Sequence, residues 1–145
     1  MEQRVDIEHT QPEAWKSLYQ LSLTLNKSAL TPIQKHLIMV RTSQVNSCAF
    51  CINMHTKEAL HSGETQQRLF LLSAWRETVL FTDEEKALLA LVEEVTLIHQ
   101  QGVSDNIYHE AEKYFSPQLI GDIILSTVMI NAWNRIAVST HKPLN

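Results

Sequence analysis

The chain has 145 residues, of which 44% are hydrophobic and 19% charged, with 3 glycines, 4 prolines and a formal net charge of −4. This length and this apolar content are typical of one globular domain with its own core, and they exclude a disordered chain. The negative net charge, without any cluster of lysine and arginine, argues against binding to nucleic acid or to an anionic membrane surface.

The first part of the chain has clear helix starts. A proline precedes apolar residues at helical spacing, which predicts a helix over about 12–28. The sequence TPIQ at residues 31–34 combines a capping box with proline at the first helical position, so a second helix is expected to begin there. Asn46 and Ser47 are both good N-cap residues, and they predict a third helix over about 48–61.

The rest of the chain continues the helical pattern. An amphipathic segment is expected over about 64–77, and a capping box after it predicts a helix that ends before Gly102. Two further helices, expected over about 105–115 and 117–138, begin after serine caps. Because no segment shows the alternation of a strand, the sequence predicts an all-α fold, a single compact helical domain of about six or seven helices over residues 1–145.

Both cysteines of the chain lie in one short motif, SCAFCINMH at residues 47–55. No apolar stretch approaches the roughly 18 residues of a membrane span, and the N-terminus has no signal-peptide core, so we expect a cytoplasmic protein. In a reducing compartment, a C-x-x-C pair is more often redox-active or metal-binding than a structural disulfide. The motif is therefore the first candidate for a functional site.

Four chemically capable side chains share one face of a helix over 48–61, since successive residues advance by about 100°. They are Cys48, Cys51, His55 and Glu58. His55 lies four residues after Cys51, the spacing at which helical side chains meet, so its imidazole can take the thiol proton or stabilise the thiolate. A helix N-terminus favours an anion, and thiols at such positions have pKa values of roughly 3.5–7.5 instead of about 8.5. Since a second thiol can close a disulfide with an oxidised first one, the motif predicts peroxide reduction or dithiol exchange.

Two other interpretations of the cysteine pair are open. The thiols could be buried structural cysteines, as isolated cysteines often are. They could also form half of a zinc site, but His61 lies on the far side of the same helix, so a further ligand has to come from elsewhere, such as His36. Because the chain has no second C-x-x-C, zinc is not favoured, and we expect neither a metal nor another cofactor.

A longer stretch around this motif resembles a known family. The pattern R-x-S-Q-x-N-x-C-x-x-C-x-x-x-H-T-K begins at Arg41, and it is followed by SAWR at residues 73–76 and INAWNRIAVS at residues 130–139. This ordered match resembles the carboxymuconolactone decarboxylase-like superfamily and, within it, the alkylhydroperoxidase (AhpD-like) branch. Trp133 and Asn134 belong to the match, and they either line a pocket or subunit interface or pack in the core.

The resemblance implies an all-helical domain that works as a homo-oligomer and reduces hydroperoxides with two cysteines. Carried onto this chain, it makes Cys51 the thiol that attacks the peroxide, Cys48 the thiol that resolves the sulfenic acid to a disulfide, and His55 part of a proton relay. The implied partners are a hydroperoxide substrate and an external dithiol or protein reductant, with no nucleic acid and no membrane. The helix geometry allows the same assignment but does not by itself say which cysteine reacts first.

Two positions depart from the family pattern. The glutamate that usually lies twelve residues before the first cysteine is replaced by His36, and the histidine that the best-characterised members carry between the cysteines is replaced by Phe50. Three consequences are open. His36 handles the proton, as its ordinary pKa near 6.5 permits; or Glu58, on the cysteine face, supplies the missing carboxylate; or the activity is weak.

Two other functions are compatible with the sequence. A cofactor-free lactone decarboxylase of the same superfamily does not need the cysteines, so the C-x-x-C pair speaks against it. A redox-sensing or zinc-stabilised helical oligomer without catalytic activity is the alternative from a different class. Oligomerisation itself is expected, because helices as apolar as the one over 117–138 can present more apolar surface than one small core covers.

Overall fold

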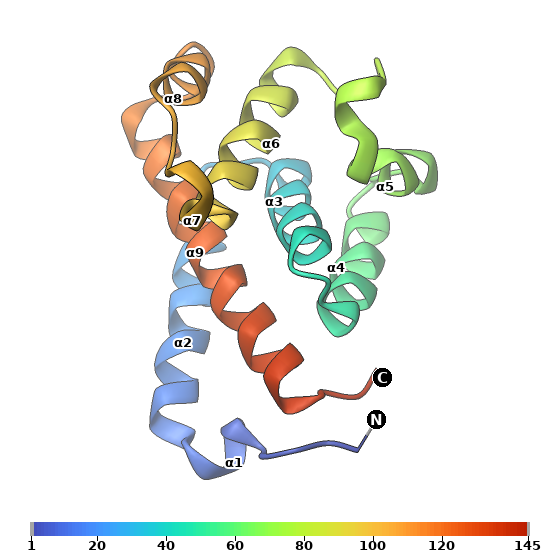
Figure 1. Cartoon of the computed structure of the whole chain (residues 1–145), viewed down its shortest axis with the longest axis vertical. Coiled ribbons are helices and arrows are strands. Elements are labelled where there is room, and N and C mark those ends of the chain that lie inside the picture. Colours follow the sequence, from blue (N-terminus) through green and yellow to red (C-terminus); the bar gives the residue numbers. More distant parts are fainter. Residues whose placement is uncertain (1, 145) are drawn as a thin grey trace.

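The computed structural model describes residues 2–144, and in these residues the chain is helical and has no β-strand (Figure 1). The elements are α1 (Ile7–Thr10), α2 (Pro12–Leu25), α3 (Pro32–Val45), α4 (Ala49–His61), α5 (Gln66–Leu71), the 3-10 helix η1 (Leu72–Glu77), α6 (Asp83–Thr96), α7 (Ile98–Gln101), α8 (Asp105–Glu112) and α9 (Pro117–Thr140). The predicted all-α fold is confirmed. None of the helices among residues 2–144 has the combination of length and apolar character that a membrane span requires.

The described residues contain nine α-helices, more than the six or seven predicted. The difference comes mainly from α1 and α7, which have four residues each and are too short to show a helical period in the sequence. The segment predicted over 64–77 is α5 followed by η1, whose helical geometry is interrupted at Ala74. The helix predicted to end before Gly102 is divided at Leu97 into α6 and α7. The remaining predicted segments each correspond to one longer helix.

The predicted capping boxes form at both α3 and α6. The hydroxyl of Thr31 accepts a hydrogen bond from the backbone N–H of Gln34, whose side chain accepts one in return from the backbone N–H of Thr31. Thr82 and Glu85 make the same pair of bonds at the start of α6. Since each box satisfies backbone N–H groups that the helix leaves without partners, the sequence fixes where these two helices begin.

The helix α3 lies at the centre of the domain, where it contacts α4, α6 and α9 (Figure 1). Its side chains Leu37, Ile38 and Val40 are at most 1% exposed, and they meet buried leucines of α6 such as Leu88 and Leu91. Each such side chain contributes about 1.5–3 kcal/mol by its burial. The cysteine helix α4 is therefore held against a central helix with a buried apolar face.

A buried carboxylate joins α6 to α3 and η1. Glu93 accepts hydrogen bonds from Arg41 at 2.7 Å, from the indole N–H of Trp75 at 2.8 Å and from Arg76 at 2.5 Å. Burial alone raises the pKa of Glu93, but these three hydrogen bonds outweigh it and hold the pKa below its ordinary value. The SAWR motif thus has a structural role here, since Trp75 and Arg76 both bind this carboxylate.

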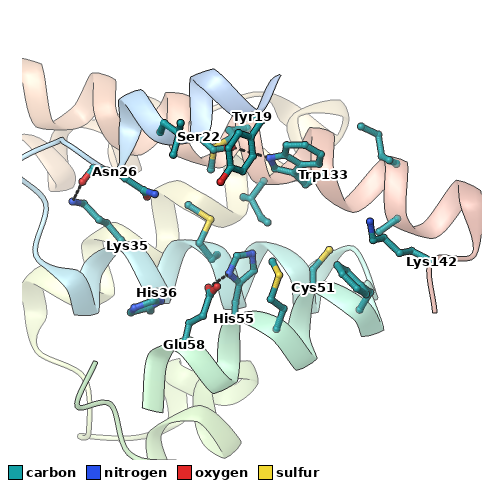
Figure 2. A pocket seen from close by; sticks show the side chains of 18 of the residues that line it. Tyr19, Ser22, Asn26, Lys35, His36, Cys51, His55, Glu58, Trp133 and Lys142 are labelled. Atoms are coloured by element: carbon teal, nitrogen blue, oxygen red, sulfur yellow. Dashed lines mark hydrogen bonds and ion pairs between the residues drawn. The ribbon is translucent and has the colours of Figure 1, made fainter. Parts of the chain in front are cut away.

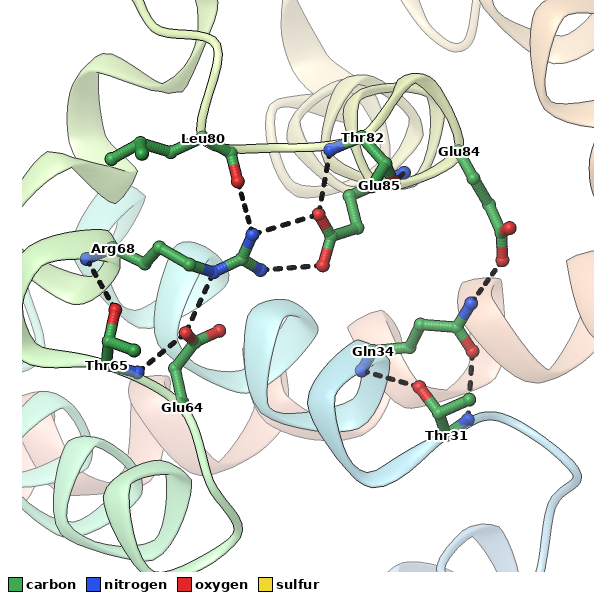
Figure 3. A network of polar contacts seen from close by, with 9 residues as sticks. All are labelled: Thr31, Gln34, Glu64, Thr65, Arg68, Leu80, Thr82, Glu84 and Glu85. Atoms are coloured by element: carbon green, nitrogen blue, oxygen red, sulfur yellow. Dashed lines mark hydrogen bonds and ion pairs between the residues drawn. The ribbon is translucent and has the colours of Figure 1, made fainter.

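A second ionic network joins α5 to the start of α6 (Figure 3). The guanidinium of Arg68 donates two hydrogen bonds to the carboxylate of Glu85, at 2.6 and 3.1 Å, and one to Glu64 at 2.8 Å. It also donates to the carbonyl oxygen of Leu80 at 2.5 Å. Because Glu64 is only 7% exposed, Arg68 neutralises a carboxylate that has little access to water.

Candidate active site

The turn between α3 and α4 sets the position of the cysteines. Ser47 has a φ of 54°, in the left-handed region, and Cys48 is the N-cap of α4. The Sγ atom of Cys48 accepts a hydrogen bond from the backbone N–H of Cys51 at 3.3 Å. The prediction that Asn46 or Ser47 caps this helix is wrong, because an N-cap residue needs an extended backbone and Ser47 is used to make the turn. Only Cys51 of the pair lies within the first turn.

Cys48 and Cys51 are joined by a disulfide, with their Cα atoms 5.4 Å apart. This separation lies within the usual range for disulfides, so the two sulfurs can bond with the backbone in this conformation. The cysteines are only 1% and 2% exposed, respectively. They differ in their surroundings, because Cys51 lines a cavity that is partly open to solvent and Cys48 is not among the residues of its wall.

The cavity has a volume of about 520 Å³ and lies between α2 and α9 on one side and α3 and α4 on the other (Figure 2). Its wall is mainly apolar, with the aromatic rings of Trp15, Tyr19, Phe50 and Trp133. The indole N–H of Trp133 donates a hydrogen bond to the hydroxyl of Ser22 at 3.0 Å, which joins α9 to α2 across the wall. A volume of this size is typical of sites that enclose a small organic molecule.

Four polar side chains of the cavity wall come from α3 and α4. They are His36, Cys51, His55 and Glu58. The other polar residues of the wall are Tyr19, Ser22, Asn26, Lys35 and Lys142. Four of the five residues that the sequence singles out thus meet at one cavity, and the fifth, Cys48, lies behind Cys51 as its disulfide partner. Among residues 2–144, no group of three or more His, Cys, Asp or Glu is placed to hold a metal ion.

His55 and Glu58 form a pair on α4, with Nδ1 of His55 2.8 Å from Oε2 of Glu58 (Figure 2). The hydrogen bond from His55 is the main cause of a lowered pKa at Glu58, so this carboxylate is ionised at neutral pH. An ionised carboxylate can only accept, so Nδ1 of His55 carries the proton. Nε2, the other ring nitrogen, takes no part in this contact.

His36 lies on α3 at the same cavity, but its ring is engaged elsewhere. Its Nε2 is 2.8 Å from the hydroxyl of Ser62, at the end of α4. Burial is the main cause of a lowered pKa at His36, and it outweighs the opposing charge of Glu58. His36 is therefore neutral at neutral pH, and its hydrogen-bond partner in the described part of the chain is Ser62 instead of His55.

Asn46 connects the turn before the cysteines to α9. Its side-chain amide donates to Oδ1 of Asn131 and to Oδ1 of Asn134, both at 2.9 Å, and the amide of Asn134 donates to the hydroxyl of Ser43 at 3.0 Å. Asn134 is 1% exposed, so it belongs to the core, whereas Trp133 beside it lines the cavity. This chain of amides holds the start of α4 in place.

The substitution Asn46→Ala is expected to lower the free energy of unfolding by about 2 kcal/mol, because it leaves the buried Oδ1 of Asn134 without a donor. Urea unfolding of the reduced protein measures the change. Asn53→Ala is the matched control, since the side chain of Asn53 on α4 has no hydrogen bond to another side chain of residues 2–144, and a change within about 0.5 kcal/mol is expected for it. Equal losses in the two variants contradict this role for Asn46.

Sequence reasoning missed the far wall of the cavity. Tyr19 and Trp15 come from α2, and Lys142 comes from the segment after α9. No spacing in the sequence relates these residues to the cysteines, because the fold brings them together from opposite ends of the chain. Trp133 is the exception, since its membership in the INAWNRIAVS motif pointed to a pocket as one of its possible positions.

Comparison with known proteins finds relatives along the whole chain. A profile of the Carboxymuconolactone decarboxylase family matches residues 12–94. The uncharacterized protein YdfG of Bacillus subtilis is 39% identical over 139 residues, which cover 96% of this chain and 95% of that protein. A solved structure from Agrobacterium tumefaciens, a protein of unknown function described as a candidate antioxidant defence protein AhpD, is 37% identical, with a TM-score of 0.97 over 99% of both chains. An uncharacterized peroxidase-related protein from Ralstonia eutropha with an alkylhydroperoxidase AhpD core shares the fold, with a TM-score of 0.83 and 18% identity over 96% of this chain and 74% of that chain.

Proposed function

Because this chain belongs to the carboxymuconolactone decarboxylase family and has its AhpD-like helical core, we propose that it reduces organic hydroperoxides with the C-x-x-C pair. One observation carries the proposal: of the two bonded cysteines, only Cys51 lines the cavity. A hydroperoxide bound in the cavity meets Cys51 first. Cys51 is therefore the attacking thiol and Cys48 the resolving thiol.

The reaction proceeds in two steps that the site can support. The thiolate of Cys51 attacks the terminal oxygen of the hydroperoxide, the O–O bond breaks, and the products are a Cys51 sulfenic acid and an alkoxide that takes up a proton to leave as an alcohol. The thiol of Cys48 then attacks the sulfenic sulfur, which forms the disulfide and releases water. An external dithiol, as a small molecule or a protein, restores both thiols by exchange.

His55 supplies the proton handling in this mechanism. It follows Cys51 by one helical turn on α4 and lines the same cavity, so its Nε2 can take the thiol proton and return it to the alkoxide. Glu58 orients the ring through Nδ1 at 2.8 Å. Among the three possibilities that the sequence leaves open, this contact favours Glu58 as the carboxylate that replaces the glutamate missing at position 36.

The substitution Glu58→Gln is expected to lower the second-order rate of hydroperoxide reduction by about 10-fold to 100-fold, because a neutral amide stabilises His55 in its protonated form less than a carboxylate does. His36→Gln is the matched control, since it also changes a polar residue of the cavity wall, and a loss of only about 2-fold to 3-fold is expected for a side chain that does not contact His55. Single-turnover kinetics of the reduced protein measures both. A larger loss in His36→Gln than in Glu58→Gln assigns the proton handling to His36 instead.

The proposal is tested by mixing the reduced protein with cumene hydroperoxide in the absence of any other reductant. We expect each chain to consume one peroxide and to lose both thiols, and we expect continuous turnover once dithiothreitol is added. Peroxide that remains while both thiols stay free overturns the proposed function. Parallel unfolding curves of the oxidised and reduced protein show whether the reduced chain is folded during the assay.

A further inference from the structure

The end of α9 places a lysine at the rim of the cavity. His141 has a φ of 53°, in the left-handed region, so the chain reverses direction directly after the helix. The backbone N–H of Lys142 then donates to the carbonyl oxygen of Ala137 at 3.0 Å. Because Ala137 is itself part of the cavity wall, this turn brings Lys142 back over the cavity.

Two aromatic rings hold the ammonium group of Lys142. Its Nζ lies 5.0 Å from the centroid of the Trp15 ring, on α2, and 5.2 Å from that of Phe50, on α4. A cation over an aromatic face is attracted by the negative electrostatic potential of that face, so these contacts favour one position of the side chain. Phe50 precedes Cys51 in the chain, and Figure 2 shows Lys142 at the Cys51 end of the cavity.

The surroundings of the Lys142 ammonium group differ from those of Lys35, the other lysine in the wall. At the opposite end of the cavity, Nζ of Lys35 donates to the carbonyl oxygens of Asn26 and Ser28, at 2.8 and 3.0 Å (Figure 2). Lys142 makes no ion pair with any carboxylate of residues 2–144. An ammonium group has three donors, and ring faces satisfy them less well than oxygen does. A half-buried cation at the rim of an apolar cavity is thus suited to an anionic oxygen.

We propose that Lys142 binds the carboxylate of an apolar organic acid, so that a hydroperoxide of such an acid is preferred over a neutral one of the same size. The acid's apolar part lies against the aromatic wall, and its carboxylate lies at the rim between Trp15 and Phe50. The binding stands on the contacts of Lys142 alone, whereas the substrate preference rests on the proposed function of Cys51. A second source of the anion, such as inorganic phosphate, lacks the apolar part that the wall accommodates.

Binding without reaction is the first arm of the test. Decanoate and the neutral 1-decanol are titrated into the reduced protein, with the fluorescence of the wall tryptophans Trp15 and Trp133 as the signal. We expect decanoate to bind about 5-fold to 10-fold more tightly in wild type. The preference should vanish in Lys142→Met, which keeps an apolar stem on the rings, and persist in Lys142→Arg. Lys16→Met, on the exposed face of α2, is the control for net charge and should keep the preference.

Turnover is the second arm, with linoleic acid hydroperoxide and its methyl ester, both below their micellar concentrations. We expect the acid to react with a kcat/KM about 5-fold to 10-fold higher in wild type and the ratio to fall to about one in Lys142→Met. If neither hydroperoxide is consumed but decanoate binding still depends on Lys142, the proposed function fails and the carboxylate site stands. If both hydroperoxides are reduced equally and the protein binds decanoate no more tightly than 1-decanol, the carboxylate site is overturned and the proposed function stands. The same conclusion follows if the Lys142→Met variant keeps the preference for the acid.

Discussion

Replacing Cys51 with serine is expected to abolish hydroperoxide consumption, with a rate at least about 10³-fold below that of wild type, because a serine hydroxyl in this site is not ionised and is a weak nucleophile.

Replacing Cys48 with serine has a different expected result. The first peroxide is still consumed at close to the wild-type rate, because Cys51 faces the cavity and Cys48 does not. The reaction then stops at a sulfenic acid on Cys51, since no resolving thiol is present.

Stopped-flow measurement of one turnover distinguishes the two variants, and dimedone trapping detects the sulfenic acid. The two serine variants also serve as matched controls for each other, because each removes the disulfide and changes one buried sulfur to oxygen. Circular dichroism establishes that both are folded. The opposite pattern, with Cys48→Ser inactive and Cys51→Ser reacting once, reverses the assignment of the two thiols.

The largest expected effect on stability comes from Arg68→Met, which should lower the free energy of unfolding by about 3–5 kcal/mol. Methionine keeps much of the side-chain volume but leaves Glu85 and the buried Glu64 without the guanidinium that neutralises them (Figure 3). The carbonyl oxygen of Leu80 loses its donor at the same time. Urea unfolding of the reduced protein, followed by circular dichroism, measures the loss.

Arg76→Met is the matched control for this prediction. The side chain of Arg76 is 57% exposed, and its partner Glu93 keeps the hydrogen bonds of Arg41 and Trp75 when Arg76 is removed. A loss of at most about 1 kcal/mol is therefore expected. If the two arginine variants lose the same free energy of unfolding, the burial of the network around Arg68 is not the reason for the contribution of Arg68 to stability.

The effect of Arg68 should also depend on pH in a defined direction. Burial alone raises the pKa of Glu85, but the hydrogen bonds and charge of Arg68, together with hydrogen bonds from Thr82, hold the pKa below its ordinary value. Stability from a lowered carboxyl pKa is present above the unfolded-state pKa and is lost as the pH falls through the folded-state pKa. The difference in the free energy of unfolding between wild type and Arg68→Met should therefore be largest near neutral pH and should shrink below about pH 4.5.

The parts of the fold that local sequence controls could be predicted. The capping boxes at Thr31 and Thr82 form as expected, and they fix the starts of α3 and α6. The cap of α4 could not be read in the same way, because Asn46 uses its side chain to bind Asn131 and Asn134 of α9, some 85 or more residues away. Asn46, which its residue type favours as an N-cap, thus uses its side chain in a tertiary contact instead.

In the candidate site, too, local sequence predicted some features, whereas others depend on tertiary contacts. Cys51, His55 and Glu58 lie on consecutive turns of α4, and Cys48 is its N-cap, so the spacing of these residues was enough to group them. The proposed order of reaction of the two cysteines was not predictable from spacing, because it rests on which cysteine lines the cavity. Lys142 was missed for the same reason, since its position depends on the reversal at His141 and on rings from α2 and α4.

The expected homo-oligomer stays a prediction. The apolar side chains Leu125, Val128 and Val138 lie on the outer face of α9 and are 47%, 50% and 48% exposed, so a second copy of the chain has an apolar surface to cover. Light scattering across micromolar concentrations measures the mass of the assembly, and a strictly monomeric mass contradicts this expectation.

The most direct test of the central claim, that Cys51 is the thiol that takes the peroxide oxygen, is the intact mass of reduced Cys48→Ser after one equivalent of cumene hydroperoxide. We predict a gain of one oxygen, which fragmentation places on Cys51, and in wild type under the same conditions the loss of two hydrogens that accompanies disulfide formation. An unchanged mass in both proteins, with the peroxide recovered, contradicts the account.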